Sequence, residues 1–286
     1  MKIRIFEMAA RDGLQSQKRI IPASDKIMLV DLLSQCGFSH IEVTAFVSPK
    51  WVPQLADAPQ IMARITRKAG VRYTALVPNL KGYRAAKAAG AHEVAVFASA
   101  SEGFSQANIN CSINESLERF APLLAEAKVD GIPARGYVSC VTDCPFDGKV
   151  APKAAARVAG ALADLGCYEI SLGDTIGHAT PKSVRALLDA VLAKLPPQRL
   201  AGHFHDTKGM ALANIEASLA CGIATFDASV GGLGGCPFAP GAAGNVDTLA
   251  VAQLMARLRH ETGLDLKQLE RAAAFARSLQ EQGHAV

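Results

Sequence analysis

LAGHFHDTKGMALANIEASLA, residues 200–220, contains one complete unit of the repeating pattern that decides the fold of this chain. Residues 200–204 are mostly apolar and have the length of a short strand, and a helical pattern covers residues 210–220. His203 and His205 are two residues apart, so a strand projects both to the same side. Two neutral imidazoles placed in this way are able to bind a divalent metal ion. A hydrogen-bonded pair of buried histidines is the alternative interpretation.

The same alternation of a short strand and a longer helix continues along the chain. The expected strands are residues 3–7, 40–44, 71–77, 92–97, 133–139, 168–172, 200–204 and 224–229. The expected helices are residues 24–36, 53–68, 81–89, 113–129, 152–165, 181–195, 210–220 and 246–259, with extra helix at 266–282. Strict alternation predicts right-handed crossovers and a parallel sheet. Eight units are the number that closes into a barrel, so we expect an α/β fold, a (β/α)8 TIM barrel with extra C-terminal helices.

The length of the chain supports this fold. A barrel of this kind typically needs ~250 residues, and the chain has 286. No linker or low-complexity segment divides it, so residues 1–286 are expected to form a single catalytic domain. An open doubly wound sheet is the alternative fold. It is less favoured because no Gly-x-Gly-x-x-Gly follows the first strand, and the glycine-rich segment follows the eighth strand instead.

Composition argues against several classes of function. The net charge is only +4, and no basic stripe interleaves with aromatic residues, so a nucleic-acid partner is not expected. No apolar run approaches the ~20 residues that a membrane span requires. The seven cysteines are odd in number and scattered, which is typical of a reducing compartment. The first expected strand starts next to the amino terminus, which leaves no room for a signal peptide. We therefore expect a cytoplasmic protein.

Polar residues gather where the expected strands end, which is where barrel enzymes place their catalytic groups. These residues are Arg11 and Asp12 after the first strand, Glu42 in the second, Asp174 after the sixth, His203 and His205 at the seventh, and Cys236 and Asn245 after the eighth. Other interpretations stay open for single residues. Asp12 and Asn245 also suit helix caps, and Arg11 also suits a structural salt bridge to Glu42 or Asp174. Cys236 also suits a small packing residue.

The chain resembles the 3-hydroxy-3-methylglutaryl-CoA lyases, which belong to a larger group of metal-dependent barrel lyases and synthases. The resembling segments are RDGLQ (11–15), FVSPKWVPQ (46–54), PNLKG (78–82), NINCS (108–112), RGYVSC (135–140), GCYEISLGDTIG (166–177), HFHDT (203–207) and GLGGCP (232–237). They follow one another in order over nearly the whole chain. The FVSPKWVPQ and GLGGCP segments favour the lyases over the synthases.

The resemblance implies a metal site and a reaction. The positions that match the family's metal ligands are Asp12, His203, His205 and Asn245, and the implied ion is Mg²⁺ or Mn²⁺. The implied reaction is a retro-Claisen cleavage of 3-hydroxy-3-methylglutaryl-CoA to acetyl-CoA and acetoacetate. The implied partner is therefore a small-molecule acyl-CoA substrate, and a homo-oligomer, dimer or tetramer, is expected.

The resemblance also implies roles for individual side chains. The implied catalytic residues are Arg11, Glu42, Asp174, His203 and Cys236. Arg11 has two donors for the developing enolate oxygen, and Glu42 holds Arg11 or a ligand in place. Asp174 assists proton transfer. Cys236, in a glycine-rich loop that closes over the substrate, donates a proton to the enolate carbon.

Two departures from the family pattern bear on the acyl chain. Leu249 stands where the family usually has a glutamate, and Lys208 stands where a tyrosine is common. A lyase for a longer branched 3-hydroxyglutaryl-CoA and a related condensing synthase are therefore alternative functions. A third alternative is a non-catalytic, metal-binding scaffold, but a scaffold has no need for Arg11, Cys236 and a complete ligand set together.

Overall fold

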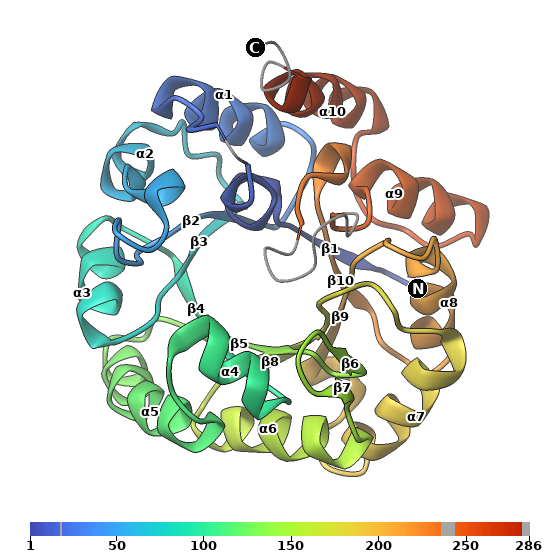
Figure 1. Cartoon of the computed structure of the whole chain (residues 1–286). Coiled ribbons are helices and arrows are strands. Elements are labelled where there is room, and N and C mark those ends of the chain that lie inside the picture. Colours follow the sequence, from blue (N-terminus) through green and yellow to red (C-terminus); the bar gives the residue numbers. More distant parts are fainter. Residues whose placement is uncertain (18, 236–243, 282–286) are drawn as a thin grey trace.

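The computed structural model describes residues 1–17, 19–235 and 244–281 (Figure 1). In this part of the chain, eight parallel strands close into one barrel in the order β1–β10–β9–β8–β5–β4–β3–β2. The strands are β1 (Arg4–Glu7), β2 (His40–Ala45), β3 (Arg72–Leu76), β4 (Glu93–Ser99), β5 (Ala134–Ser139), β8 (Glu169–Asp174), β9 (Leu200–Phe204) and β10 (Thr225–Ala228). The predicted TIM barrel is confirmed.

Helices surround the barrel, with the main apolar core between the helices and the sheet (Figure 1). They are α1 (Ala23–Ser34), α2 (Ala58–Arg64), α3 (Leu80–Ala88), α4 (Glu102–Ile109), α5 (Ile113–Val129), α6 (Pro152–Asp164), α7 (Pro181–Leu192), α8 (Ala211–Leu219), α9 (Thr248–Arg257) and α10 (Leu266–Glu281). No helix in the described ranges is long and apolar enough to cross a membrane.

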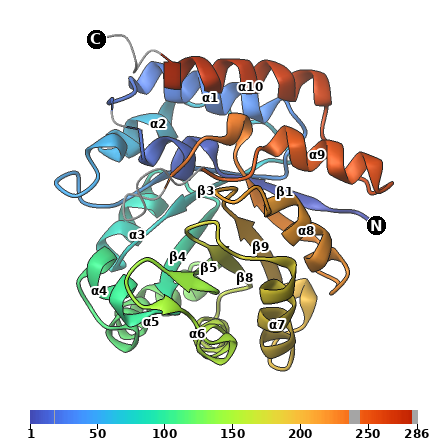
Figure 2. The same cartoon turned by 45° about the vertical axis from the view of Figure 1, so that its right-hand side comes forward.

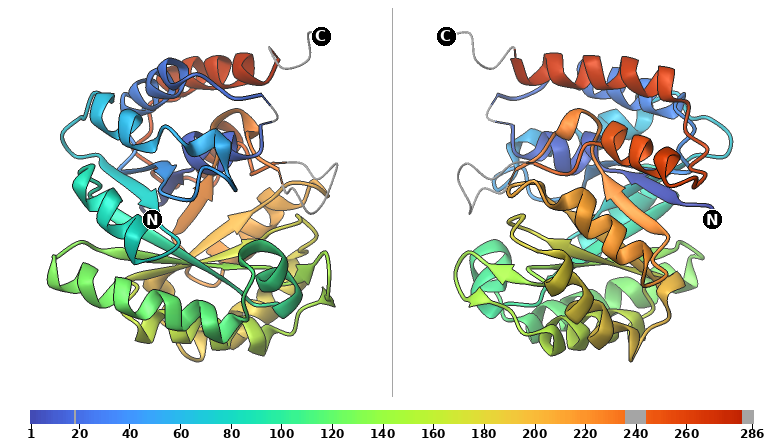
Figure 3. Two further views of the ribbon diagram at one scale, coloured as in Figure 1. Left: turned by 60° about the vertical axis from the view of Figure 1, so that its left-hand side comes forward. Right: turned by 90° about the vertical axis from the view of Figure 1, so that its right-hand side faces the viewer.

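The expected C-terminal helix is α10, which lies alongside α1 outside the ring of barrel helices (Figures 2 and 3). The loop before α10 contacts the loop after α1. Asp265 N, in the first loop, donates to the carbonyl oxygen of Cys36, in the second, over 2.9 Å. Gly37 has φ +94, and a Cβ at this position would collide with the carbonyl oxygen of Gly263. The contact therefore needs glycine at position 37.

Three segments differ from the sequence prediction. The helix expected at 53–68 is only a 3-10 turn, Pro53–Leu55, followed by the short α2. Thr66 lies beyond α2, and its backbone N donates to Asp31 Oδ1 over 2.7 Å, which is a contact with α1. Helix α4 was not expected. It begins at Glu102, and the hydroxyl of the preceding Ser101 accepts from Phe104 N as the N-cap of the helix.

The loop between β5 and α6 also contains an antiparallel hairpin that was not expected, formed by β6 (Asp143–Cys144) and β7 (Gly148–Lys149). Its tip is fixed to the start of α4, because Asp147 accepts from Ser101 Oγ over 2.6 Å and from Gly103 N over 2.8 Å. The hairpin therefore lies with α4 beyond the carboxyl ends of β4 and β5.

Candidate active site and metal centre

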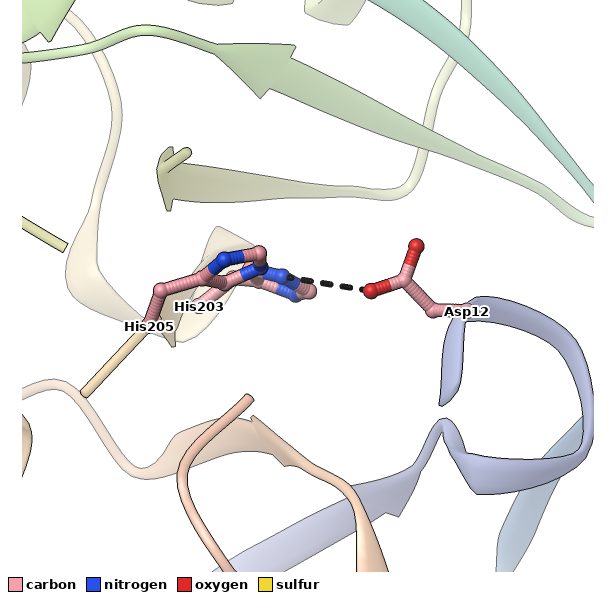
Figure 4. Close-up of side chains that lie close together, drawn as sticks. All are labelled: Asp12, His203 and His205. Carbon is pink, nitrogen blue, oxygen red and sulfur yellow. Dashed lines mark ion pairs between the residues drawn. The ribbon is translucent and has the colours of Figure 1, made fainter. Parts of the chain in front are cut away.

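Three of the expected ligands meet at the carboxyl ends of β1 and β9 (Figure 4). Asp12 lies in a π-helical turn, Ala9–Gly13, directly after β1, and His203 and His205 lie at the end of β9 and just beyond it. One ligand atom from each residue lies within 4.8 Å of the other two. Nε2 of His203 is 3.9 Å from Oδ2 of Asp12. No other group of three or more histidine, cysteine or acidic side chains approaches this geometry in the described ranges.

Asn245, the fourth expected ligand, joins this cluster from the segment that precedes α9. It pairs with His205 in an antiparallel bridge, and its Nδ2 donates to Asp12 Oδ2 over 2.8 Å and to the carbonyl oxygen of Leu233 over 3.1 Å. Asn245 is not the N-cap of α9. That position is taken by Asp247, whose side chain accepts from Leu249 N.

The chemistry of these side chains suits a divalent cation. Nδ1 of His205 and Oδ1 of Asn245 are buried and have no hydrogen-bond partner among the described residues, so neither residue is fully committed to contacts within the protein. Burial and the neighbouring His203 lower the pKa of His205 to about 4, which keeps its ring neutral at pH 7. Burial raises the pKa of Asp12, but Arg11 and the two histidines outweigh it, and the pKa falls to about 2. The cluster thus offers one carboxylate, two imidazoles and an amide oxygen.

Arg11 lies next to the cluster and is held by two carboxylates. Its Nε donates to Glu42 Oε1, and its Nη1 donates to Asp12 Oδ1 over 2.5 Å. Burial lowers the pKa of the guanidinium, but Glu42 and Asp12 outweigh it, so Arg11 stays charged. No described residue accepts from Nη2. One charged donor therefore remains for a substrate oxygen.

A buried polar network fills the barrel behind these residues, and the sequence analysis missed it. The hydroxyl of Tyr137 donates to Glu42 Oε2 over 2.6 Å and accepts from Arg135 Nη1 over 3.0 Å. Arg135 in turn donates two hydrogen bonds to Asp227, which contacts His203. The signal in the sequence was a charged residue inside a short buried strand: Arg135 in β5 and Asp227 in β10.

Asp174, the expected proton-transfer residue, ends β8 outside the three-residue cluster. Its two oxygens accept from His178 N over 3.1 Å and from Ala179 N over 3.0 Å, which fixes the turn that leads to α7. Burial raises the pKa of Asp174 to about 6. The carboxyl group therefore changes its protonation state close to neutral pH.

Cys236, the expected proton donor, lies outside the described residues. The described glycines on either side of it pack closely against the site. A Cβ at Gly234, where φ is +144, would lie 2.6 Å from Nδ2 of Asn245, and one at Gly244 would lie 2.5 Å from the carbonyl oxygen of Gly232. Glycine at these positions lets the backbone approach Asn245 without displacing it.

Comparison with known proteins agrees with this arrangement. The HMGL-like family model matches residues 2–276. The chain belongs to the HMGL-like family. Among members of the family, a Pseudomonas aeruginosa protein named 3-hydroxy-3-isohexenylglutaryl-CoA/hydroxy-methylglutaryl-CoA lyase is 56% identical over 94% of this chain and 89% of its own length.

Solved structures of HMG-CoA lyases have the same fold as this HMGL-like chain. The Brucella melitensis enzyme superposes with a TM-score of 0.97 at 60% identity, over 98% of this chain and 99% of its own. An Acinetobacter baumannii HMG-CoA lyase in complex with coenzyme A and 3-methylmalate superposes with a TM-score of 0.93 at 35% identity, over 98% of this chain and 92% of its own.

Proposed function

We propose that this chain is a divalent-metal-dependent carbon–carbon lyase that cleaves 3-hydroxy-3-methylglutaryl-CoA to acetyl-CoA and acetoacetate. The observation that carries the proposal is the meeting of Asp12, His203, His205 and Asn245 at one rim of the barrel. These four residues lie in a chain that matches HMG-CoA lyases over nearly its full length. A scaffold protein has no use for this ligand set next to a buried arginine.

The reaction sets the tasks that the side chains must perform. The 3-hydroxyl group loses its proton, the bond between C2 and C3 breaks, and the electrons of that bond leave as the enolate of acetyl-CoA. The enolate carbon is then protonated, which gives acetyl-CoA, and the former hydroxyl carbon becomes the ketone of acetoacetate. A bound Mg²⁺ or Mn²⁺ supplies Lewis-acid polarisation of substrate oxygens, which lowers the pKa of the hydroxyl group. Asp12, His203, His205 and Asn245 are the residues that would hold this ion.

Arg11 is the residue that we propose to stabilise the enolate. Glu42 fixes its Nε and Asp12 fixes its Nη1, so the guanidinium is oriented before the substrate arrives. Its remaining donor, Nη2, is available to the oxygen on which negative charge develops. A preorganised charged donor in a buried site is typically worth several kcal/mol in the transition state.

Proton transfer is proposed for two other residues. Asp174 is able to hold or release a proton near neutral pH, because its pKa is raised to about 6 by burial. Cys236 is proposed from the sequence alone to donate a proton from Sγ to the enolate carbon. Its place between Gly235 and Pro237 is typical of a loop that closes over a substrate and excludes water.

A second candidate function is the cleavage of a longer branched 3-hydroxyglutaryl-CoA. The observation in its favour is that the Pseudomonas aeruginosa relative is named for the isohexenyl substrate as well as for the methyl one. Leu249, which stands where related enzymes usually have a glutamate, makes the start of α9 more apolar, four residues after Asn245.

One experiment tests both candidates. The purified protein is incubated with Mg²⁺ and either 3-hydroxy-3-methylglutaryl-CoA or its isohexenyl analogue, and the release of acetyl-CoA is followed. We expect both substrates to be cleaved, with acetoacetate formed from the first. Cleavage of the isohexenyl analogue alone would assign the second function, and release of acetyl-CoA from neither would contradict the lyase.

We also propose a cytoplasmic location and a homo-oligomeric state, both of which rest on the sequence and the family. Curated relatives include a mitochondrial Bos taurus enzyme and a cytoplasmic Danio rerio enzyme, so the location varies within the family. Cell fractionation and light scattering on the full chain are the direct measurements. A monomer in light scattering would contradict the proposed assembly.

A further inference from the structure

Asp227 is a residue of the barrel interior that contacts the proposed metal ligand His203 directly. It lies in β10, in register with His203 on the neighbouring β9, and its side chain is fully buried. Its Oδ2 is 3.1 Å from Nδ1 of His203. The ring of His203 therefore has one nitrogen facing Asp227 and the other, Nε2, facing Asp12.

The other partners of Asp227 keep it ionised. Arg135 donates from Nη2 to Oδ1 over 2.7 Å and from Nη1 to Oδ2 over 3.1 Å, and Ser171 Oγ donates to Oδ2 over 2.7 Å. The two hydrogen bonds from the Arg135 guanidinium form a charge-assisted pair with this carboxylate, and Arg135 and Ser171 both act as donors to it. An ionised carboxylate only accepts hydrogen bonds. The proton of this contact must therefore be on Nδ1 of His203.

We propose that Asp227 is a positioning residue, which fixes the His203 tautomer that has its proton on Nδ1 and its lone pair on Nε2, and so presents Nε2 to the metal ion. This inference rests on the metal site of the proposed function. Metal-bound histidines commonly donate their second N–H to a carboxylate, which sets both the tautomer and the orientation of the ring. Arg135 acts one step further away, because it orients the carboxylate of Asp227 through two hydrogen bonds.

Asparagine is a poor substitute at position 227. Both oxygens of the Asp227 carboxylate face hydrogen-bond donors. Oδ1 faces Arg135. Oδ2 faces Arg135, Ser171 and His203. The amide nitrogen of an asparagine would face at least one of these donors without an acceptor. Asp227→Asn keeps the size of the side chain and removes the fixed acceptor, so it separates hydrogen bonding from packing.

The first test reads the tautomer directly in the wild-type protein. The protein is labelled with ¹⁵N-histidine and loaded with Mg²⁺, and the signals of His203 are assigned by their absence from a His203→Gln variant. We expect the proton on Nδ1. A proton on Nε2 would overturn the proposal, and this measurement decides the question even where Asp227→Asn fails to fold.

The second test measures the binding of Mn²⁺ to the metal-free protein by titration calorimetry, without any assay of activity. Asp227→Asn is expected to weaken binding about 10- to 100-fold, the usual effect of losing the carboxylate partner of a metal-bound histidine. Glu169→Gln is the matched control. Glu169 accepts from Nε of Arg135 in the same network but has no contact with His203, so its variant should keep wild-type affinity.

Equal Mn²⁺ affinity in Asp227→Asn and wild type would overturn the proposal, as would equal losses in Asp227→Asn and Glu169→Gln. A wild-type protein that binds Mn²⁺ and holds the Nδ1 proton but does not cleave 3-hydroxy-3-methylglutaryl-CoA would contradict the proposed function and still support the role of Asp227. The two failures are thus distinguishable.

Discussion

The amide nitrogen of Asn245 donates to Oδ2 of Asp12 over 2.8 Å, while the carbonyl oxygen of the same amide is buried without a partner among the described residues. The hydrogen bond fixes which way the amide points. Asn245 therefore orients Asp12 with one atom and has the other atom free for a cation. This relationship gives Asn245 two functions in the proposed metal site, and it leads to the first prediction.

Asn245→Ala should weaken the binding of Mn²⁺ by at least about 10-fold, because it removes an oxygen ligand and also the hydrogen bond that orients Asp12. Titration of the metal-free protein measures this change. Asp247→Ala is the control. It removes the N-cap of α9 two residues later, which should lower the free energy of unfolding by about 1 kcal/mol and leave metal affinity unaltered. Unchanged Mn²⁺ affinity in Asn245→Ala would remove Asn245 from the ligand set.

Arg11→Lys should lower kcat by roughly 100-fold or more, the scale of losing one donor to a developing oxyanion. Lysine keeps the charge, but it does not reproduce the planar fork that contacts Glu42 and Asp12 and has a further donor for the proposed enolate oxygen. Steady-state kinetics separates the two possible roles of Arg11. A normal kcat with a raised KM would mean that Arg11 binds the substrate and does not stabilise the transition state.

Cys236→Ser should lower kcat by roughly 10²- to 10⁴-fold, the usual span for the loss of a general acid. The melting temperature and metal affinity should stay close to wild type, since the volume of the side chain barely changes. Thiol alkylation should inactivate the enzyme, and saturating substrate should protect it. Cys221→Ser, at a half-buried cysteine after α8, is the control and should behave as wild type. A stable Cys236→Ser protein with normal turnover would exclude the thiol from catalysis.

Glu7 makes the stability of this protein depend on pH. Its carboxyl group accepts from Ala9 N over 2.9 Å, Val230 N over 3.0 Å and Thr248 Oγ1 over 2.7 Å, and burial raises its pKa from 4.5 to about 7. Between these two values the folded protein holds a proton that the unfolded chain has lost. The contribution of Glu7 to the free energy of unfolding therefore falls as pH rises from 4.5 to 7.

Glu7→Gln imitates the protonated carboxyl group at every pH. Relative to wild type, the free energy of unfolding of the variant should increase as pH rises from 5 to 8. The increase is at most about 3 kcal/mol, which corresponds to the full difference between the folded and unfolded pKa of Glu7. Urea unfolding at the two pH values measures the difference. A difference between variant and wild type that is the same at both pH values would contradict a raised pKa for Glu7.

The sequence predicted the barrel because each strand–helix unit is a local pattern. Where the prediction was wrong, a contact distant in sequence decided the structure. The segment 53–68 has helical periodicity, but Thr66 is held by Asp31 of α1, 35 residues earlier, and the chain is extended from Ile65. A window of neighbouring residues contains no information about that contact.

The residues of the candidate site also fall into a group that the sequence predicted and a group that it did not. Its rim residues were predicted because polar groups at strand ends share one face of any parallel barrel, whatever the details of packing. Asp227 and Arg135 were missed because they are 92 residues apart in sequence and each lies inside a strand. That their side chains meet in the barrel interior follows only from how the strands are ordered around the barrel.

The central claim is that the cluster of Asp12, His203, His205 and Asn245 holds the metal ion that the cleavage requires. The most direct measurement first removes metal with EDTA and then removes the EDTA by buffer exchange. The metal-free protein is titrated with Mn²⁺, and bound metal and the formation of acetoacetate from 3-hydroxy-3-methylglutaryl-CoA are measured on the same samples. Turnover should be absent without metal and should rise in proportion to bound Mn²⁺, up to one ion per chain. Full turnover by the metal-free protein, or Mn²⁺ binding without acetoacetate, would contradict it.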